Sequence, residues 1–187
     1  MTKNNRLVIF TLILIALTVV VKYVCAPVLG LSGFSPIIAI ALFAGMSINN
    51  KKYTFILPLI ALFASDVVIE ILHRLDLFVF SGFYKGQIIN YNLLMLSVLI
   101  GWVLKGKSYI TVGFGAIAAS TVYFLLSNFS VWYGSTMYPQ SFDGLMTCYV
   151  SALPFYRNEL ISTTIFLPMI ILGYNYIIEG KTKIVVS

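Results

Sequence analysis

The chain has 187 residues, of which 60% are hydrophobic and only 10% are charged. A soluble domain carries about 25% charged residues, so the composition excludes a water-soluble globular protein and predicts a single integral membrane domain over residues 1–187. The net charge of +6 does not indicate nucleic acid as a partner, because the basic residues stand in short clusters beside apolar runs, where they orient membrane proteins.

Six apolar runs follow one another along the chain, and each is a candidate membrane span. They cover residues 7–24, 31–48, 53–72, 91–104, 109–126 and 160–178. A spanning helix needs roughly 20 apolar residues, so the fourth run is long enough only if the polar residues before it are also helical. Unbroken runs of this kind are not typical of barrel strands. The predicted fold class is therefore all-α, a polytopic membrane protein with six transmembrane helices.

The positions of the basic residues predict the orientation. With the N-terminus in the cytoplasm, eight of the twelve lysines and arginines fall on the cytoplasmic side, as the positive-inside rule requires. These eight are Lys3, Arg6, Lys51, Lys52, Lys105, Lys107, Lys181 and Lys183. Both termini are therefore expected in the cytoplasm, and the long connections 73–90 and 127–159 are expected outside.

The third run contains charged residues, which are costly inside a membrane and are functional candidates for that reason. Asp66 and Glu70 are four residues apart and share a helix face, while Glu70 and Arg74 stand in the order that favours a salt bridge. Glu70, His73 and Arg74 are expected at the outer boundary. Asp66 should lie deeper, where it is either a contact to a substrate or ion, or a structural ion pair or helix cap with a neighbouring span. The sequence leaves both alternatives open.

The connection from Ser127 to Arg157 is too polar for a span and too aromatic for a solvated loop. Aromatic residues are common at membrane interfaces, but aromatic walls with a few polar groups are also typical of small-molecule pockets. We expect a partly re-entrant or amphipathic outer segment that covers an outward-facing pocket. The expected substrate-binding residues are Asp66, Asn128, Trp132, Tyr138, Tyr149 and Arg157.

Two charged residues flank the expected start of the last span. Glu159 is interpreted as a residue near a helix N-terminus, where a negative charge is favourable. Arg157 can pair with Asp66 or Asp143, or bind an anionic group of a ligand, and the sequence does not choose between these roles.

No motif indicates catalysis, a cofactor or a metal. The serines have no general base at a recognisable spacing, and Cys25 and Cys148 are too few for a disulfide framework and lack metal-ligand spacing. We therefore expect no enzymatic activity. Small side chains in the second and third runs permit close approach of helices, either within the bundle or to another membrane subunit. They are Ala39, Ala41, Ala44, Gly45, Ala61, Ala64 and Ser65.

Three blocks resemble a family of small bacterial six-span membrane proteins of uncharacterised function. The blocks are GFSPIIAIALFAG (33–45), LPLIALFASD (57–66) and the run 127–160, which carries an S-N-F-x-V-W … Y-P … C-Y … P-F-x-R-N signature. Gly33 stands where the family motif has Asn, which puts a side-chain role at that position in doubt. The resemblance implies a multi-pass protein of the bacterial cytoplasmic (inner) membrane and no established activity.

The architecture is also similar to that of the S-components of energy-coupling-factor transporters. Those proteins bind a vitamin-like micronutrient near the outer face and associate with a transmembrane coupling subunit and ATPases. By this similarity we expect a substrate-binding membrane protein for uptake of a small molecule. The alternative is an integral membrane scaffold or assembly factor without transport activity. A membrane enzyme that acts on lipid is the weakest hypothesis, since no catalytic group is identifiable.

Overall fold

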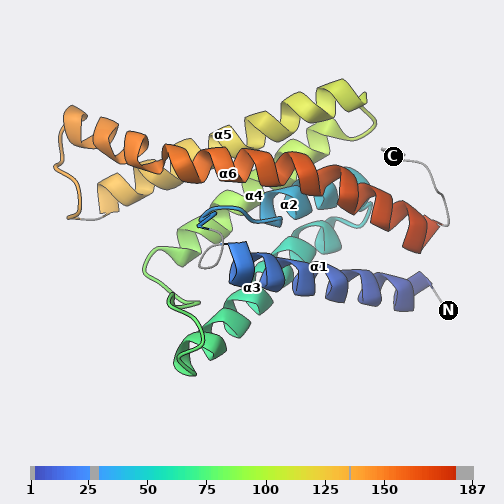
Figure 1. Cartoon of the computed structure of the whole chain (residues 1–187). Helices are drawn as coiled ribbons and strands as arrows, with labels where there is room; N and C mark the ends of the chain where they lie inside the picture. The colour runs from blue at the N-terminus through green and yellow to red at the C-terminus, as the bar shows by residue number, and fades with distance from the viewer. Residues whose placement is uncertain (1–2, 26–29, 135, 180–187) are drawn as a thin grey trace.

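The computed structural model describes residues 3–25, 30–134 and 136–179. It is all-helical over this part of the chain, which confirms the predicted fold class (Figure 1). The helices are α1 (Lys3–Cys25), α2 (Ile37–Ser47), α3 (Lys51–Arg74), α4 (Gln87–Leu104), α5 (Tyr109–Gly134) and α6 (Phe142–Tyr174), and α6 runs into a π-helical turn, η1 (Asn175–Glu179).

Five of the six helices are long and apolar enough to cross a membrane, namely α1, α3, α4, α5 and α6. The protein is thus a multi-pass membrane protein. The start of α1, the end of α6 and the two short connections 48–50 and 105–108 lie at one end of the bundle (Figure 1). The connections 75–86 and 136–141 lie toward the other end. The fourth run is a full-length helix because its polar start, from Gln87, is helical.

The second run forms a shorter helix than expected. α2 has 11 residues, about 16 Å at 1.5 Å per residue, which is well below the roughly 30 Å thickness of the hydrocarbon layer. The chain before it cannot continue the helix, because Gly33 has a φ of +87° and Pro36 stands at the N-cap. Every residue from Ile38 to Met46 is buried. A helix that is apolar on all sides is a core helix, and the other helices surround it.

The small residues of α2 pack inside the bundle. α2 crosses α4 at Gly45 and Gly101, where a Cβ on Gly45 would clash with the carbonyl oxygen of Val98 and a Cβ on Gly101 with that of Leu42. Close backbone approach of this kind is the usual role of small residues in membrane helices. Of the two alternatives for the small residues of α2, packing within the bundle is the one the structure shows.

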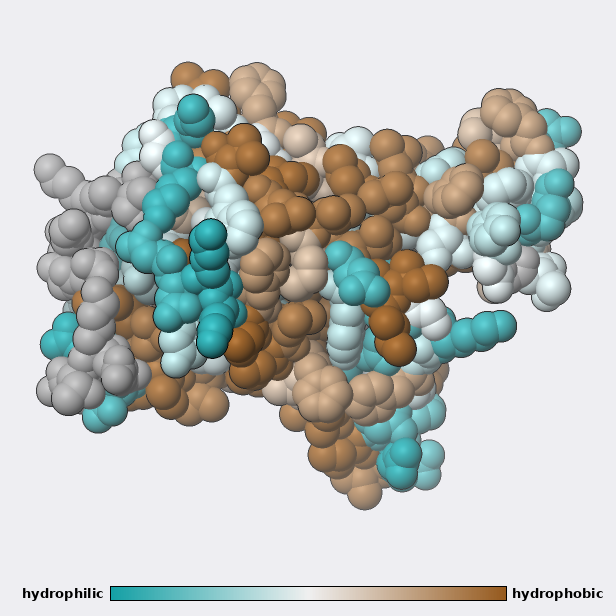
Figure 2. Space-filling view, turned by 180° about the vertical axis from the view of Figure 1, so that it is seen from behind, coloured by the Kyte–Doolittle hydropathy of each residue, from teal (hydrophilic) through white to brown (hydrophobic). Residues whose placement is uncertain are grey.

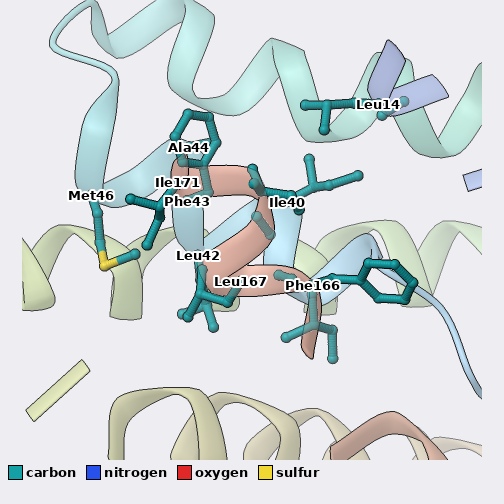
Figure 3. Packing of buried hydrophobic residues seen from close by; sticks show 14 of the residues in the cluster. Leu14, Ile40, Leu42, Phe43, Ala44, Met46, Phe166, Leu167 and Ile171 are labelled. Carbon is teal, nitrogen blue, oxygen red and sulfur yellow. The ribbon is translucent and has the colours of Figure 1, made fainter. Parts of the chain in front are cut away.

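The apolar core contains residues of all six helices. Leu14 of α1, Ile40 and Phe43 of α2, and Phe166 and Ile171 of α6 are among its buried side chains (Figure 3). The face of the molecule seen in Figure 2 is broadly apolar between the two ends of the bundle. Large apolar side chains such as those of Val8, Val103 and Phe114 are exposed. In water these side chains would be unfavourable, so the surface is consistent with contact to the lipid bilayer.

The segment from Ser127 to Arg157 differs from the expected outer connection, because most of it is helical. α5 continues to Gly134, α6 begins at Phe142, and the described residues between them are only 136–141. Ser141 caps α6 by accepting a hydrogen bond of 3.2 Å from the backbone N–H of Gly144. The segment is therefore a helical hairpin that continues the bundle (Figure 1), and we call residues 127–158 the α5–α6 hairpin.

Candidate functional site

A cavity of about 330 Å³ lies among the helices near the connections 30–36 and 75–86. All six helices contribute to its walls, together with residues of both connections. Its volume is at the lower end of the roughly 300–1,000 Å³ found for small-molecule sites. The polar groups in the walls are few, and most of the lining is aliphatic or aromatic, as is usual for sites of this kind.

Asp66 of α3 is the most highly bonded polar group of the cavity. Its Oδ1 accepts a bond of 2.6 Å from Lys22 Nζ of α1, and its Oδ2 accepts bonds of 2.6 Å from Gln87 Nε2 and 2.7 Å from Tyr91 OH of α4. The residue is only 5% exposed. A buried carboxylate is stable only when it is paired and hydrogen-bonded. The structural ion pair is thus the alternative that the structure shows for Asp66.

This polar group connects three helices. Lys22 also donates a bond of 2.9 Å to Ser65 Oγ, one residue before Asp66 in α3. Gln87 is the first residue of α4, so the N-terminal end of that helix lies beside the Asp66 carboxylate. The four side chains Lys22, Asp66, Gln87 and Tyr91 are hereafter the Asp66 cluster.

The connection 75–86 forms one wall of the cavity and is held against α3. A Cβ on Gly82 would clash with the carbonyl oxygen of Asp66, so only glycine permits this approach. Glu70 accepts bonds of 2.8 Å from Ser81 Oγ and 3.1 Å from the Gly82 N–H. It also forms the predicted salt bridge with Arg74, at 2.8 Å. The carboxylate of Glu70 therefore holds the connection in place from outside the cavity.

Tyr84 lies in the same wall and accepts a bond of 2.6 Å from Asn90 Nδ2. Burial raises the pKa of its phenol, and the charge of Asp66 raises it further, against the opposing effect of the Asn90 bond. The phenol is therefore neutral at physiological pH and offers an aromatic face with a hydroxyl group to the cavity.

Glu159 of α6 is the second carboxylate in the cavity wall. Its Oε1 atom is buried and has no hydrogen-bond partner among the described residues, and the same holds for Ser35 Oγ, which also lines the cavity. Ser120 of α5 lies beside the Glu159 carboxyl group. The cavity thus contains two carboxylates. Both oxygens of Asp66 accept hydrogen bonds from the protein, whereas Glu159 has an oxygen that accepts none among the described residues.

Contacts on either side of Glu159 hold it at the cavity. Asn158 Nδ2 donates a bond of 2.9 Å to the carbonyl oxygen of Ser32, and Ser162 Oγ donates one of 2.8 Å to that of Ser35. A Cβ on Gly33 would lie 2.9 Å from the Phe155 carbonyl oxygen. The connection 30–36 is therefore packed tightly along this part of α6.

Sequence reasoning missed Glu159 because it placed the residue at a helix start. α6 begins at Phe142, so Glu159 is well inside the helix and has no role at its N-terminus. The signal that identifies it is helical spacing, since the buried residues Ser162, Thr163 and Phe166 follow it at intervals of three, four and seven. That spacing indicates that Glu159 lies on the buried face of a helix only when the helix is known to begin before residue 159.

Of the six residues expected to bind substrate, Asp66 is the one that lines the cavity. The others lie on the α5–α6 hairpin, and three of them bond to backbone carbonyl groups of the hairpin or of α5 just before it. Asn128 Nδ2 donates to the Phe124 carbonyl oxygen at 2.8 Å, Trp132 Nε1 to that of Pro139 at 2.9 Å, and Tyr149 OH to that of Leu125 at 2.9 Å.

The remaining two expected residues are Tyr138 and Arg157. Tyr138 is half-buried in the turn of the hairpin. Arg157 is exposed, and its Nη2 donates a bond of 3.4 Å to Asn158 Oδ1. The ion-pair partner of Asp66 is Lys22 rather than Arg157. The structure thus does not bring the expected set together around one pocket.

The described residues include His, Cys, Asp and Glu side chains, the usual protein ligands of metal ions. No group of three or more His, Cys, Asp or Glu side chains is placed to hold a metal ion within them. Cys25 and Cys148 are both free and buried. Cys148 Sγ lies 3.5 Å from the Asn128 carbonyl oxygen, as expected for a small buried side chain with a weak donor.

Comparison with known proteins gives one match. The model of a protein family described as "Family of unknown function (DUF6580)" matches residues 2–185. No curated protein and no solved structure matches the chain. A functional conclusion must therefore come from the geometry of the cavity.

Proposed function

The chain belongs to the family of unknown function DUF6580, and we propose that it is a substrate-binding membrane protein for the uptake of a small molecule. The expected substrate class is a vitamin-like micronutrient. The observation that carries the proposal is the cavity, which all six helices line and which contains an open carboxylate oxygen at Glu159.

The Asp66 cluster supports this proposal through its position. A purely structural ion pair can be placed anywhere between two helices, but this one lies in the wall of a cavity and joins α1, α3 and α4 around it. Pre-organised polar groups that are fixed by one another are typical of binding sites. The cluster thus gives the cavity a fixed shape before a ligand enters.

The charges at the two ends of the bundle support access from outside. Arg6, Lys51, Lys52, Lys105 and Lys107 belong to the end where α1 starts and where the short connections lie (Figure 1). By the positive-inside rule this end is cytoplasmic. The cavity, beside the connections 30–36 and 75–86, then lies toward the outer face of the bacterial inner membrane.

The proposed partners are those that the expected resemblance to S-components implies, although no solved structure matches the chain. A transmembrane coupling subunit and ATPases would supply the energy for release of the ligand into the cell. Docking through the small residues of α2 is not an option, because these are buried. Ala64 of α3, which is half-buried, is the one small residue of the expected set at the surface of the bundle.

The test is native mass spectrometry of the protein purified in mild detergent from its own membranes, followed by incubation with a panel of water-soluble micronutrients. We expect a bound small molecule, or stoichiometric uptake of one panel member. Protein that carries no ligand and takes up none from the panel would count against the proposal.

A second candidate function is an integral membrane scaffold or assembly factor. The observation in its favour is the aromatic tip of the α5–α6 hairpin, where Tyr133 is 74% and Phe142 is 73% exposed. The tip stands apart from the main body (Figure 2). If this function holds, a membrane partner should co-purify with the wild type and be lost with Tyr133→Ser and Phe142→Ser, but remain bound to Glu159→Gln.

A further inference from the structure

The two carboxylates in the cavity wall differ in a way that indicates the charge of the ligand. Both oxygens of Asp66 already accept bonds from the protein, whereas Glu159 Oε1 accepts none among the described residues. We propose that the ligand is a small organic cation with at least one N–H group, whose positive end binds Glu159. This inference rests on the proposed function and assigns its substrate class.

The charge balance of the cavity supports a cation. Among the lining residues, Lys22 is the one basic side chain, and its charge is matched by Asp66. Glu159 then leaves the cavity with an excess of one negative charge when it is ionised. A buried, unpaired carboxylate is unfavourable, and a bound cation removes this cost and fills the open acceptor. A neutral ligand without N–H groups leaves the acceptor unfilled, and an anion adds repulsion.

Aromatic side chains provide the rest of a site for a cation. Six of them line the cavity, namely Phe34, Phe78, Phe80, Tyr84, Tyr91 and Tyr123. The faces of aromatic rings carry partial negative charge and attract ammonium and related groups. The Ser35 hydroxyl, which also lacks a partner among the described residues, is available as a second acceptor. A ligand with two N–H groups would satisfy both open acceptors.

One feature of the cavity favours an anionic ligand over a cation. Ile37 and Ile38, at the start of α2, are part of its lining, so the partial positive charge of a helix N-terminus is near. This charge amounts to roughly half a unit, which is less than the full charge of a carboxylate. The full charge of the carboxylate outweighs it, so that on balance the cavity selects for a cation.

The test uses two matched sets of probes that differ only in the charge of the terminal group. One set is phenethylamine, 2-phenylethanol and phenylacetate, and the other is tryptamine, tryptophol and indole-3-acetate. Binding to the purified full-length protein in detergent is measured by saturation-transfer NMR and thermal stabilisation. In at least one set the amine should bind about tenfold more tightly than the alcohol, which corresponds to about 1.4 kcal/mol, and the carboxylate should bind most weakly.

Variants then assign the preference to Glu159. Glu159→Gln keeps the shape of the side chain and should abolish the preference for the amine while the alcohol binds as before. Asp143→Asn removes an exposed carboxylate from the same helix and should leave the preference unchanged. Should Glu159→Gln fail to fold, Glu159→Asp keeps the charge with a shorter reach, and it should retain the preference at reduced affinity.

Several results would overturn the inference. These are equal binding of amine and alcohol by the wild type, tightest binding of the carboxylate, no binding of either amine, or an undiminished preference in folded Glu159→Gln. A co-purified ligand that is neutral or anionic refutes the cation but leaves the uptake function standing. Absence of any ligand or panel binding refutes both, so the two failures are distinguishable.

Discussion

Lys22 of α1 and Asp66 of α3 form an ion pair of 2.6 Å in the wall of the cavity. Their side chains are 24% and 8% exposed, respectively, so the pair is largely removed from solvent. Because Gln87 and Tyr91 fill the second oxygen of Asp66, the pair also fixes the start of α4. The geometry of the cavity therefore depends on a contact between residues that are 44 positions apart.

The first prediction concerns this pair. Asp66→Asn leaves Lys22 without a partner charge and should destabilise the protein by about 2–3 kcal/mol, less than the roughly 3–5 kcal/mol of a fully buried pair because Lys22 is partly exposed. Thermal unfolding in detergent measures the effect. The double variant Lys22→Met/Asp66→Asn should recover part of the loss, since no unpaired charge remains. Equal stability of Asp66→Asn and wild type would show that the pair is not structural.

The second prediction concerns the wall formed by the connection 75–86. Gly82→Ala places a methyl group against the backbone of α3 and should displace this wall, with a destabilisation of about 1–3 kcal/mol and weaker ligand binding. Gly113→Ala is the matched control, because a Cβ there meets nothing within 4 Å. It should be neutral or stabilise α5 by up to about 1 kcal/mol. Similar unfolding temperatures for the two variants would argue against close packing at Gly82.

The third prediction concerns the crossing of α2 and α4. Gly101→Ala introduces a side chain where the backbones of the two helices touch, so the helices must separate. The expected loss is about 1–3 kcal/mol or more, visible as a lower yield of monodisperse protein and a lower unfolding temperature. If Gly101→Ala behaves like Gly113→Ala, α2 is not packed at the centre of the bundle as described.

The fourth prediction separates the cavity from the α5–α6 hairpin. Trp132→Phe removes the hydrogen bond to Pro139 and should cost about 0.5–1.5 kcal/mol or less, because the side chain is only partly buried. Ligand binding should be unchanged, since Trp132 does not line the cavity. Loss of binding in a stably folded Trp132→Phe would instead support the expectation from sequence that the hairpin residues bind the substrate.

Much of the fold was predictable because apolar composition and span length are local properties. The all-α class, five full-length helices and the Glu70–Arg74 salt bridge all follow from residues within one helix. The hairpin was not predicted because residues 127–157 are too polar to resemble a membrane span, whereas α6 begins at Phe142 and continues through Pro154 and Pro168. Proline is tolerated in membrane helices when neighbouring groups satisfy the freed backbone carbonyl.

The candidate site was less predictable because it depends on tertiary contacts. Asp66 was recognisable as an intramembrane charge, but nothing local in the sequence identifies Lys22 as its partner. Glu159 became a candidate only when α6 was seen to begin at Phe142. The aromatic residues that line the cavity come from four separate segments, which are the connections 30–36 and 75–86 and the helices α4 and α5.

The central claim is that the cavity holds a small molecule, and a cavity-filling variant tests it most directly. Ser35→Trp places a large side chain in the 330 Å³ space, while Thr136→Trp adds the same side chain to the exposed turn of the hairpin. Ligand occupancy of each folded protein is measured by native mass spectrometry. We predict a bound small molecule in the wild type and Thr136→Trp, and none in Ser35→Trp. Full occupancy in Ser35→Trp, or no ligand in any of the three proteins, would contradict the account.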